Sequence, residues 1–200
     1  MRKLLNILYN FHWVVANEAA RSAQPYAGMY ATFLSTNGIK AVINLRGRHP
    51  KFSWWKYEHE TCGQLGVVHL DAMLDSKRLP LKEMLVALFD AFDAAPRPFL
   101  IKCSGGQDRT SFAAALYLVH RDGWDAMGRA EGQFAGWPYL HFPKPAQLWL
   151  KQFLLYAFVQ SGGRPLAEWV RELYDPEALA KALAPGGFNG IWEPWKPPSK

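Results

Sequence analysis

Short apolar runs alternate with amphipathic stretches along most of the chain, a pattern typical of α/β proteins. Residues 41–45, 66–70 and 99–102 are apolar runs of the length found in buried parallel strands, and 11–17 reads as a first strand ahead of a turn at Arg21-Ser22. The strand–helix alternation predicts a central, mostly parallel sheet, flanked by helices and linked by right-handed crossovers.

Apolar residues recur at helical spacing between these strands. A helix is expected over 26–37, with Gly38 in the position that follows a helix, and a loop over 47–64 should run into a second helix. Leu81 to Phe92 shows the i, i+3, i+4 spacing of an amphipathic helix. Residues 71–80 are expected to form a loop.

The C-terminal part predicts further helices. Residues 124–135 fit a helix weakened by two glycines, and another pattern runs from 166 to 183. The segment 147–160 is apolar nearly all round and too short to span a bilayer, which favours a buried helix; peripheral contact with a membrane surface is the alternative. Residues 1–184 are therefore predicted to form a single domain, and 185–200 an irregular tail rich in Pro and Gly.

Candidate chemistry lies directly after the apolar run that ends at Lys102. Cys103 and Arg109 flank a glycine-bearing loop, and a helical pattern starts at Thr110. A strand, a glycine loop and a helix N-terminus in this order form an anion-binding cradle, because the loop N–H groups converge and the helix adds partial positive charge. Gly105 and Gly106 allow the backbone to approach a ligand closely.

A cysteine in such a cradle is expected to be acidic, since helix N-termini and nearby cations stabilise a thiolate. The planar guanidinium of Arg109 matches two oxygens of a phosphate. The pair predicts a thiolate that attacks phosphorus while the arginine holds the equatorial oxygens, and the Thr110 hydroxyl could assist the departing sulfur. The alternative is a buried core thiol at Cys103 with no chemical role.

Cys-x5-Arg-Thr after an apolar strand resembles the signature loop of the cysteine-dependent protein tyrosine and dual-specificity phosphatases. Residues 21–25 (Arg-Ser-Ala-Gln-Pro) and 38–46 (Gly-Ile-Lys-Ala-Val-Ile-Asn-Leu-Arg) resemble the bacterial dual-specificity-like branch, and similar segments cover roughly 11–142. The resemblance implies that fold with extra C-terminal helices, and a cysteinyl-phosphate intermediate. The implied phosphate-binding residues are Ser104, Gly105, Gly106, Gln107, Asp108 and Arg109.

In this family an aspartate on the loop after the preceding strand protonates the leaving oxygen. Asp75 is the expected general acid because it lies on an exposed, basic segment; Asp71 is the alternative, and Asp108 is a third candidate. The sequence departs from the family at Lys102, where the residue before the cysteine is usually His. The variable loop positions also carry no cation, which disfavours strong selection for polyphosphorylated inositols.

Composition adds constraints. The formal net charge of +6 and the pI near 9.3 favour an acidic partner, and a phosphorylated protein or a phosphorylated lipid or inositol is the expected substrate. No basic run or base-stacking motif favours nucleic acid. His59 and Glu60 lack a second cluster at ligand spacing, so neither a metal nor an organic cofactor is expected. Two cysteines and an interrupted apolar N-terminus favour a cytoplasmic protein over one with a signal or anchor.

Overall fold

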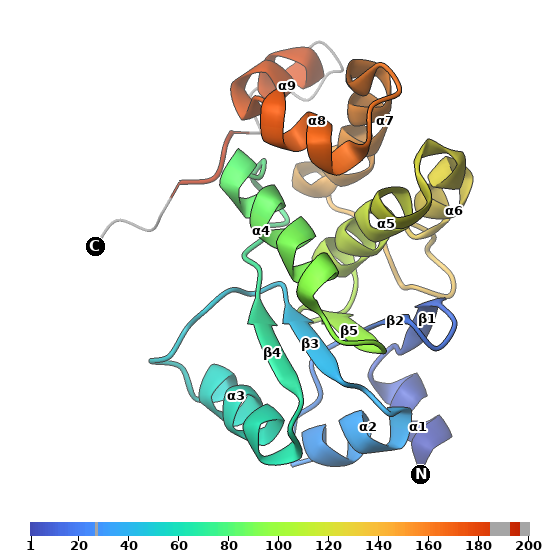
Figure 1. Cartoon of the computed structure of the whole chain (residues 1–200), viewed down its shortest axis with the longest axis vertical. Helices are drawn as coiled ribbons and strands as arrows, with labels where there is room; N and C mark the ends of the chain where they lie inside the picture. Colours follow the sequence, from blue (N-terminus) through green and yellow to red (C-terminus); the bar gives the residue numbers. More distant parts are fainter. Residues whose placement is uncertain (27, 185–192, 197–200) are drawn as a thin grey trace.

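A computed structural model describes residues 1–26, 28–184 and 193–196. A five-stranded sheet has the order β1-β2-β5-β3-β4 (Figure 1). The first strand pairs antiparallel with the second, and the other neighbouring pairs are parallel, which confirms the predicted α/β class. The bounds are β1 His12–Val15, β2 Ala19–Ser22, β3 Ala41–Asn44, β4 Val68–Asp71 and β5 Phe99–Lys102.

The predicted turn at Arg21-Ser22 is wrong. These residues end β2, which pairs with β5 so that Arg21 lies opposite Ile101 and Ser22 opposite Lys102. Every residue of β2 is buried, including the arginine. A polar Arg-Ser pair is typical of a turn only when solvent satisfies it; here other parts of the protein bind the guanidinium, and the strand continues.

The helices cover both faces of the sheet. Helices α1 to α3 lie below the sheet in Figure 1, and α4 to α9 lie above it. The side chains of Phe99 and Ile101 belong to the upper core, and that of Leu100 belongs to the lower core, as the alternation of a strand requires. Because both faces are covered, β2, β3 and β5 are buried throughout, and their apolar composition follows.

The helices agree with the sequence pattern except at the N-terminus, where α1 was not predicted. Gly38 ends α2 with a left-handed φ of 67°, as expected. Within the described residues, no helix combines the length and the apolar character needed to cross a membrane. The bounds are α1 Arg2–Leu8, α2 Tyr30–Asn37, α3 Ser53–Leu65, α4 Lys82–Ala94, α5 Asp108–Asp122, α6 Met127–Gly132, α7 Trp149–Ser161, α8 Leu166–Glu172 and α9 Pro176–Leu183.

Helix α7 buries one face in the upper core, through Trp149 and Phe153, but Leu155, Phe158 and Val159 on its other face are exposed, so the buried-helix prediction holds for one face alone. The prediction of an irregular tail over 185–200 falls mostly outside the described residues. Within the described part of the tail, Pro194 forms an isolated parallel bridge with Leu79. The Leu79 N–H donates to the Glu193 carbonyl at 2.9 Å, and the Trp195 N–H donates to the Leu79 carbonyl at 2.8 Å.

Candidate active site

The loop of residues 103–107 joins β5 to α5 at the carboxyl edge of the parallel strands, where active sites of such sheets lie. Cys103 is 3% exposed. Burial raises the pKa of its thiol, but Arg109, the Thr110 hydroxyl and the backbone N–H groups of Gly106 and Gln107 together lower the pKa below the usual value. These groups favour the thiolate form of Cys103.

The other predicted members of the loop lie around this sulfur. Ser104 and Gly105 are exposed at the mouth, whereas Thr110 is fully buried. The Thr110 hydroxyl has no nitrogen or oxygen partner among the described residues, which leaves it free to donate to the sulfur. A buried hydroxyl without a partner costs free energy, and a thiolate at Cys103 would satisfy it.

Arg109 is half-buried and turns toward the loops that follow β3 and β4. Its Nη1 lies 3.5 Å from the carbonyl oxygen of Leu45 and 3.5 Å from that of Leu74, and its Nη2 donates to the Ser104 hydroxyl at 3.1 Å. None of these hydrogen-bond acceptors among the described residues is a carboxylate, so the Arg109 guanidinium is available as a fork to an anion bound at the loop.

Arg46 is a second cation beside this arginine. Its guanidinium lies 3.4 Å from the ring centroid of Trp54 and donates to the Gln24 side chain at 3.0 Å. Burial lowers the pKa of Arg46, Tyr26 raises it, and the nearby charge of Arg109 lowers it further. Two arginines close enough to repel each other favour a bound anion.

Arg21 holds the loop from behind, a role that the sequence analysis missed. Its Nη2 donates to the Gly106 carbonyl at 3.1 Å and to the Ser111 hydroxyl at 2.8 Å, and its Nη1 donates to the Gln133 carbonyl at 3.0 Å. The guanidinium also lies 4.2 Å from the centroid of the Tyr139 ring. Burial lowers the pKa of Arg21 to about 10, although Tyr139 and the thiolate act in the opposite direction.

Position 106 accommodates only glycine. Its φ is +64°, and a Cβ atom there would lie 2.3 Å from the Ala23 backbone nitrogen and 2.6 Å from the Ser22 carbonyl carbon. The end of β2 therefore contacts the loop of residues 103–107, the candidate phosphate loop, directly. Gln24 continues this contact, because its N–H donates to the Ser104 carbonyl at 3.1 Å. Any larger residue at position 106 would push the loop away from the strand.

Lys102, the departure from the family, does not point to solvent. Its Nζ is buried, contacts a carboxylate oxygen of Glu58 on α3 and donates to Gln24 at 3.0 Å. The other Glu58 oxygen lies 2.8 Å from Nε2 of His69. Burial lowers the pKa of Lys102 to about 8, while Glu58 raises it. For Glu58, burial raises the pKa, but His69 and Lys102 bring it below its usual value.

The three acid candidates differ in their partners. Asp71 accepts hydrogen bonds from Trp55 Nε1 at 3.1 Å and from Asn44 Nδ2 at 2.7 Å, which fix it as a strand-end carboxylate. The Asp75 side chain accepts only a local bond from the Lys77 N–H at 2.7 Å among the described residues. The residue before it, Leu74, supplies a carbonyl oxygen to Arg109, so the Asp75 loop lies against this arginine.

Asp108, at the start of α5, is held by the segment before α7. It accepts a hydrogen bond from Gln147 Nε2 at 2.7 Å, and His141 Nδ1 lies 3.4 Å away without a hydrogen bond. The same Gln147 nitrogen lies 3.4 Å from the hydroxyl of Ser76, whose carbonyl accepts from Trp149 Nε1 at 3.1 Å. Gln147 thus links the phosphate loop to the loop that carries Asp75.

The cluster at His59 and Glu60 forms no metal site. No group of three or more His, Cys, Asp or Glu side chains across the described ranges has a metal-binding arrangement. Instead the His59 ring stacks on Trp55, with the centroids 4.6 Å apart, and approaches His69. The His69 ring in turn contacts the buried Glu58. Cys62 is also buried, and burial next to Glu58 raises the pKa of its thiol to about 12.

Comparison with known proteins finds structural likeness without close sequence similarity. No protein-family model and no curated protein matches the chain. TpbA of P. aeruginosa matches with a TM-score of 0.52 and 22% identity, over 88% of this chain and 92% of that one. PTPMT1 gives 0.53 and 17%, over 77% and 99%. The core catalytic domain of the PP-IP phosphatase SIW14 from S. cerevisiae gives 0.51 and 15%, over 93% and 96%.

Proposed function

We propose, from the fold that this chain shares with cysteine-based phosphatases of the tyrosine and dual-specificity type, that it hydrolyses phosphate monoesters. The observation that carries the proposal is the environment of Cys103, whose pKa is lowered by Arg109, Thr110 and two loop N–H groups despite burial. A core thiol without a chemical role would experience only burial, which raises the pKa.

The mechanism assigns one role to each residue. The Cys103 thiolate attacks phosphorus, while Arg109 and the N–H groups of the loop bind the equatorial oxygens of the phosphoryl group. Asp75 donates a proton to the leaving oxygen, which leaves a cysteinyl phosphate. Water then attacks phosphorus, Asp75 accepts its proton, and the Thr110 hydroxyl stabilises the sulfur as it departs. These roles require no metal ion and no organic cofactor.

Asp75 is preferred as the general acid because its loop lies against Arg109 and its carboxylate is bound only by its own loop. Asp71 receives two side-chain donors and is fixed as an acceptor. Asp108 is positioned by Gln147, which favours a role in ordering the loop. A mobile carboxylic acid that closes over the substrate has the geometry that leaving-group protonation needs.

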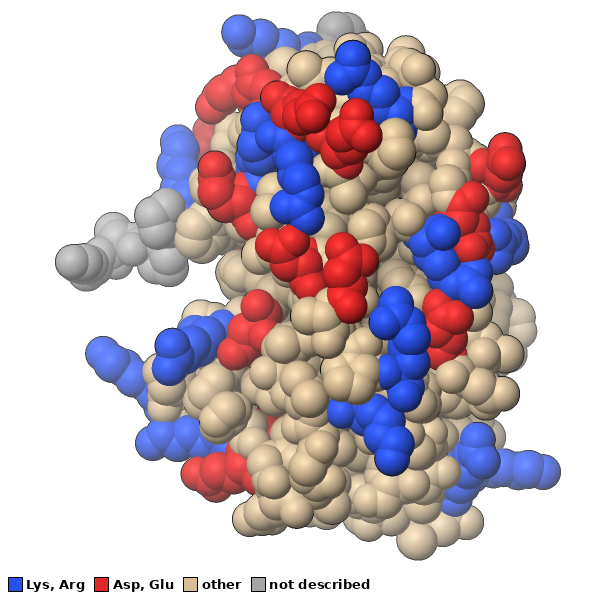
Figure 2. Space-filling model, in the orientation of Figure 1, with Lys and Arg blue, Asp and Glu red and all other residues tan. Residues whose placement is uncertain are grey.

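A phosphorylated protein side chain, phosphotyrosine first, is the proposed substrate. A cysteine-to-serine form of P. aeruginosa TpbA was crystallised with pTyr. That structure matches 89% of the present chain with a TM-score of 0.52. A phosphorylated lipid or inositol is the second candidate. It is favoured by Arg46 beside Arg109, which offers a second cation to a substrate with more than one phosphate. Lys and Arg side chains at the left edge of Figure 2, over the β3–α3 segment, add positive charge.

Hydrolysis of p-nitrophenyl phosphate tests the class. We expect turnover that orthovanadate inhibits, and loss of turnover in Cys103→Ser but not in the matched control Cys62→Ser. A protein that binds phosphate without turnover would instead show orthophosphate-protected modification of Cys103 and no release of p-nitrophenol. A panel of phosphopeptides, phosphoinositides and inositol phosphates then distinguishes the substrate candidates.

A further inference from the structure

We infer that α1 and the loop of residues 137–142 form a docking surface for an anionic lipid bilayer. This docking surface consists of exposed apolar side chains from two segments far apart in the sequence: Leu4, Ile7, Leu8, Trp137, Leu140 and Phe142. It is distinct from α7, the segment for which the sequence suggested membrane contact. The inference does not depend on the proposed catalysis.

The apolar face of α1 is turned outward by specific contacts. Leu5 is buried in the lower core, and the amides of Asn6 and Asn37 exchange two hydrogen bonds, of 3.0 and 2.9 Å, between α1 and α2. Ile7 is consequently 80% exposed and Leu4 69% exposed. A short helix anchored by one leucine and an asparagine pair has its apolar side toward the solvent, the reverse of the usual arrangement.

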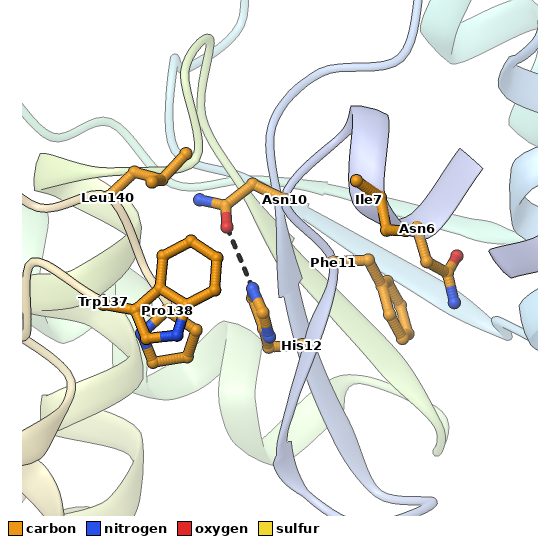
Figure 3. A pocket seen from close by; sticks show the side chains of 8 residues that line it. All are labelled: Asn6, Ile7, Asn10, Phe11, His12, Trp137, Pro138 and Leu140. Carbon is orange, nitrogen blue, oxygen red and sulfur yellow. Dashed lines mark hydrogen bonds between the residues drawn. The ribbon is translucent and has the colours of Figure 1, made fainter. Parts of the chain in front are cut away.

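The second segment continues this surface. Trp137 is 82% exposed, and it lines the same pocket of about 310 Å³ as Ile7 and Leu140. Figure 3 shows Trp137, Pro138 and Leu140 on one side of this pocket and the α1 residues on the other, with Asn10 and His12 between them. Leu140 adopts a φ of +56°, a conformation that L side chains rarely adopt, so its place at the surface is held against backbone strain.

The surrounding charges select a lipid surface as the occupant. Residues 1–17 contain no Asp or Glu but carry Arg2 and Lys3, both exposed; residues 132–150 also contain no acidic residue and carry Lys144, which is exposed and lies two positions after Phe142. The surface over α1, at the lower right of Figure 2, is accordingly blue and tan. Exposed Leu and Ile, an exposed Trp and flanking cations without acids are the combination by which interfacial segments bind anionic headgroups and the acyl boundary.

The docking surface is joined to the phosphate loop. Asn10, directly after α1, donates from Nδ2 to the Gly106 carbonyl at 3.3 Å and to the Tyr139 carbonyl at 3.0 Å. One amide therefore bridges the two halves of the surface and the backbone of the loop next to Cys103. A protein docked on a bilayer through this surface would hold the phosphate loop at a fixed position relative to the headgroups.

Vesicle co-sedimentation of the full chain tests the inference, with Cys103→Ser as the background so that turnover plays no part. We expect binding to phosphatidylserine–phosphatidylcholine vesicles, weaker binding to phosphatidylcholine alone, and further weakening by salt. Ile7→Glu and Trp137→Ala, made separately, should each lower the partition coefficient about tenfold. Val159→Glu, at an apolar position on α7 that is 64% exposed, is the control and should bind as the parent does.

Three results would overturn the inference: no binding of the parent to anionic vesicles at low salt, equal losses in Val159→Glu and Ile7→Glu, or a dimer that Ile7→Glu converts to a monomer. The last would assign the surface to a second copy of the chain. Thermal unfolding and p-nitrophenyl phosphate turnover of Ile7→Glu and Trp137→Ala, in the chain with Cys103 intact, establish that the substitutions leave the fold unchanged.

Discussion

Replacement of Lys102 by Met removes the charge that compensates a buried carboxylate. The side chains of Lys102 and Glu58 are both 0% exposed, so solvent does not screen the pair. Loss of one partner of a buried ion pair costs about 3–5 kcal/mol, because the other charge stays buried and uncompensated. A domain of this size is stable by about 5–15 kcal/mol, so Lys102→Met should lose about a fifth or more of its unfolding free energy.

Urea unfolding followed by far-UV circular dichroism measures this loss, and a double-mutant cycle assigns it. Glu58→Gln keeps an oxygen acceptor for only one of its two partners, His69 and Lys102, and removes the negative charge. The double variant Lys102→Met/Glu58→Gln should be more stable than Lys102→Met alone, with a coupling of about 1–3 kcal/mol. Additive effects of the two substitutions would refute the reasoning that the pair acts as one buried unit.

The pH dependence of the unfolding free energy tests the lowered pKa of Lys102 independently. The folded protein releases the Lys102 proton near pH 8, whereas the unfolded chain keeps it to about 10.5, so between these values the unfolded state binds more protons. The unfolding free energy should therefore rise with pH over this range, relative to that of Lys102→Met, by up to about 3 kcal/mol. A parallel pH course in the two proteins would show that Lys102 titrates as a free lysine.

Three further predictions concern the site. Iodoacetamide at neutral pH should label Cys103 and leave Cys62 unlabelled, because the first thiol has a lowered pKa and the second one near 12; equal labelling by mass spectrometry would contradict this. Since the thiolate is the active form, the acidic limb of the kcat/KM profile should follow the lowered pKa of Cys103, and Arg21→Lys, which loses the two-sided hold on the loop, should shift this limb to higher pH as well as lower the rate. Asp75→Ala should lower kcat on an alkyl phosphate by about 10²–10⁴ and remove the basic limb, while Asp71→Asn should not; full turnover of Asp75→Ala would reassign the acid.

Features that depend on neighbouring residues could be predicted from the sequence. The strand Phe99–Lys102, the loop after it and the start of α5 follow one another without interruption, so their chemistry could be inferred from adjacent residues. The amphipathic helix α4 was equally visible, because its buried residues recur at the helical period. Both features depend on spacing alone.

Long-range contacts account for what the sequence analysis missed. The sequence pattern predicts Arg21 in a turn. The strand pairing places it in β2, where it contacts Gly106, 85 positions further along the chain. From the sequence, Lys102 is a replacement of the usual histidine with no evident partner. In the structure its partner is Glu58 on α3. The polar character of both residues was visible, but their partners are set by topology, and no local pattern identifies them. A buried cation in a strand is the signal that would have prompted a search for such partners.

The described tail residues contact the loop that carries Asp75. Leu79 closes the loop that carries Asp75, and its N–H and carbonyl both bind tail residues, while Arg78 lies 3.6 Å from Glu193. The opposite flank of that loop is tied to α7 through the carbonyl of Ser76. Loss of residues 193–196 would remove one of these two attachments, which in the proposed mechanism would alter how readily Asp75 reaches the leaving oxygen.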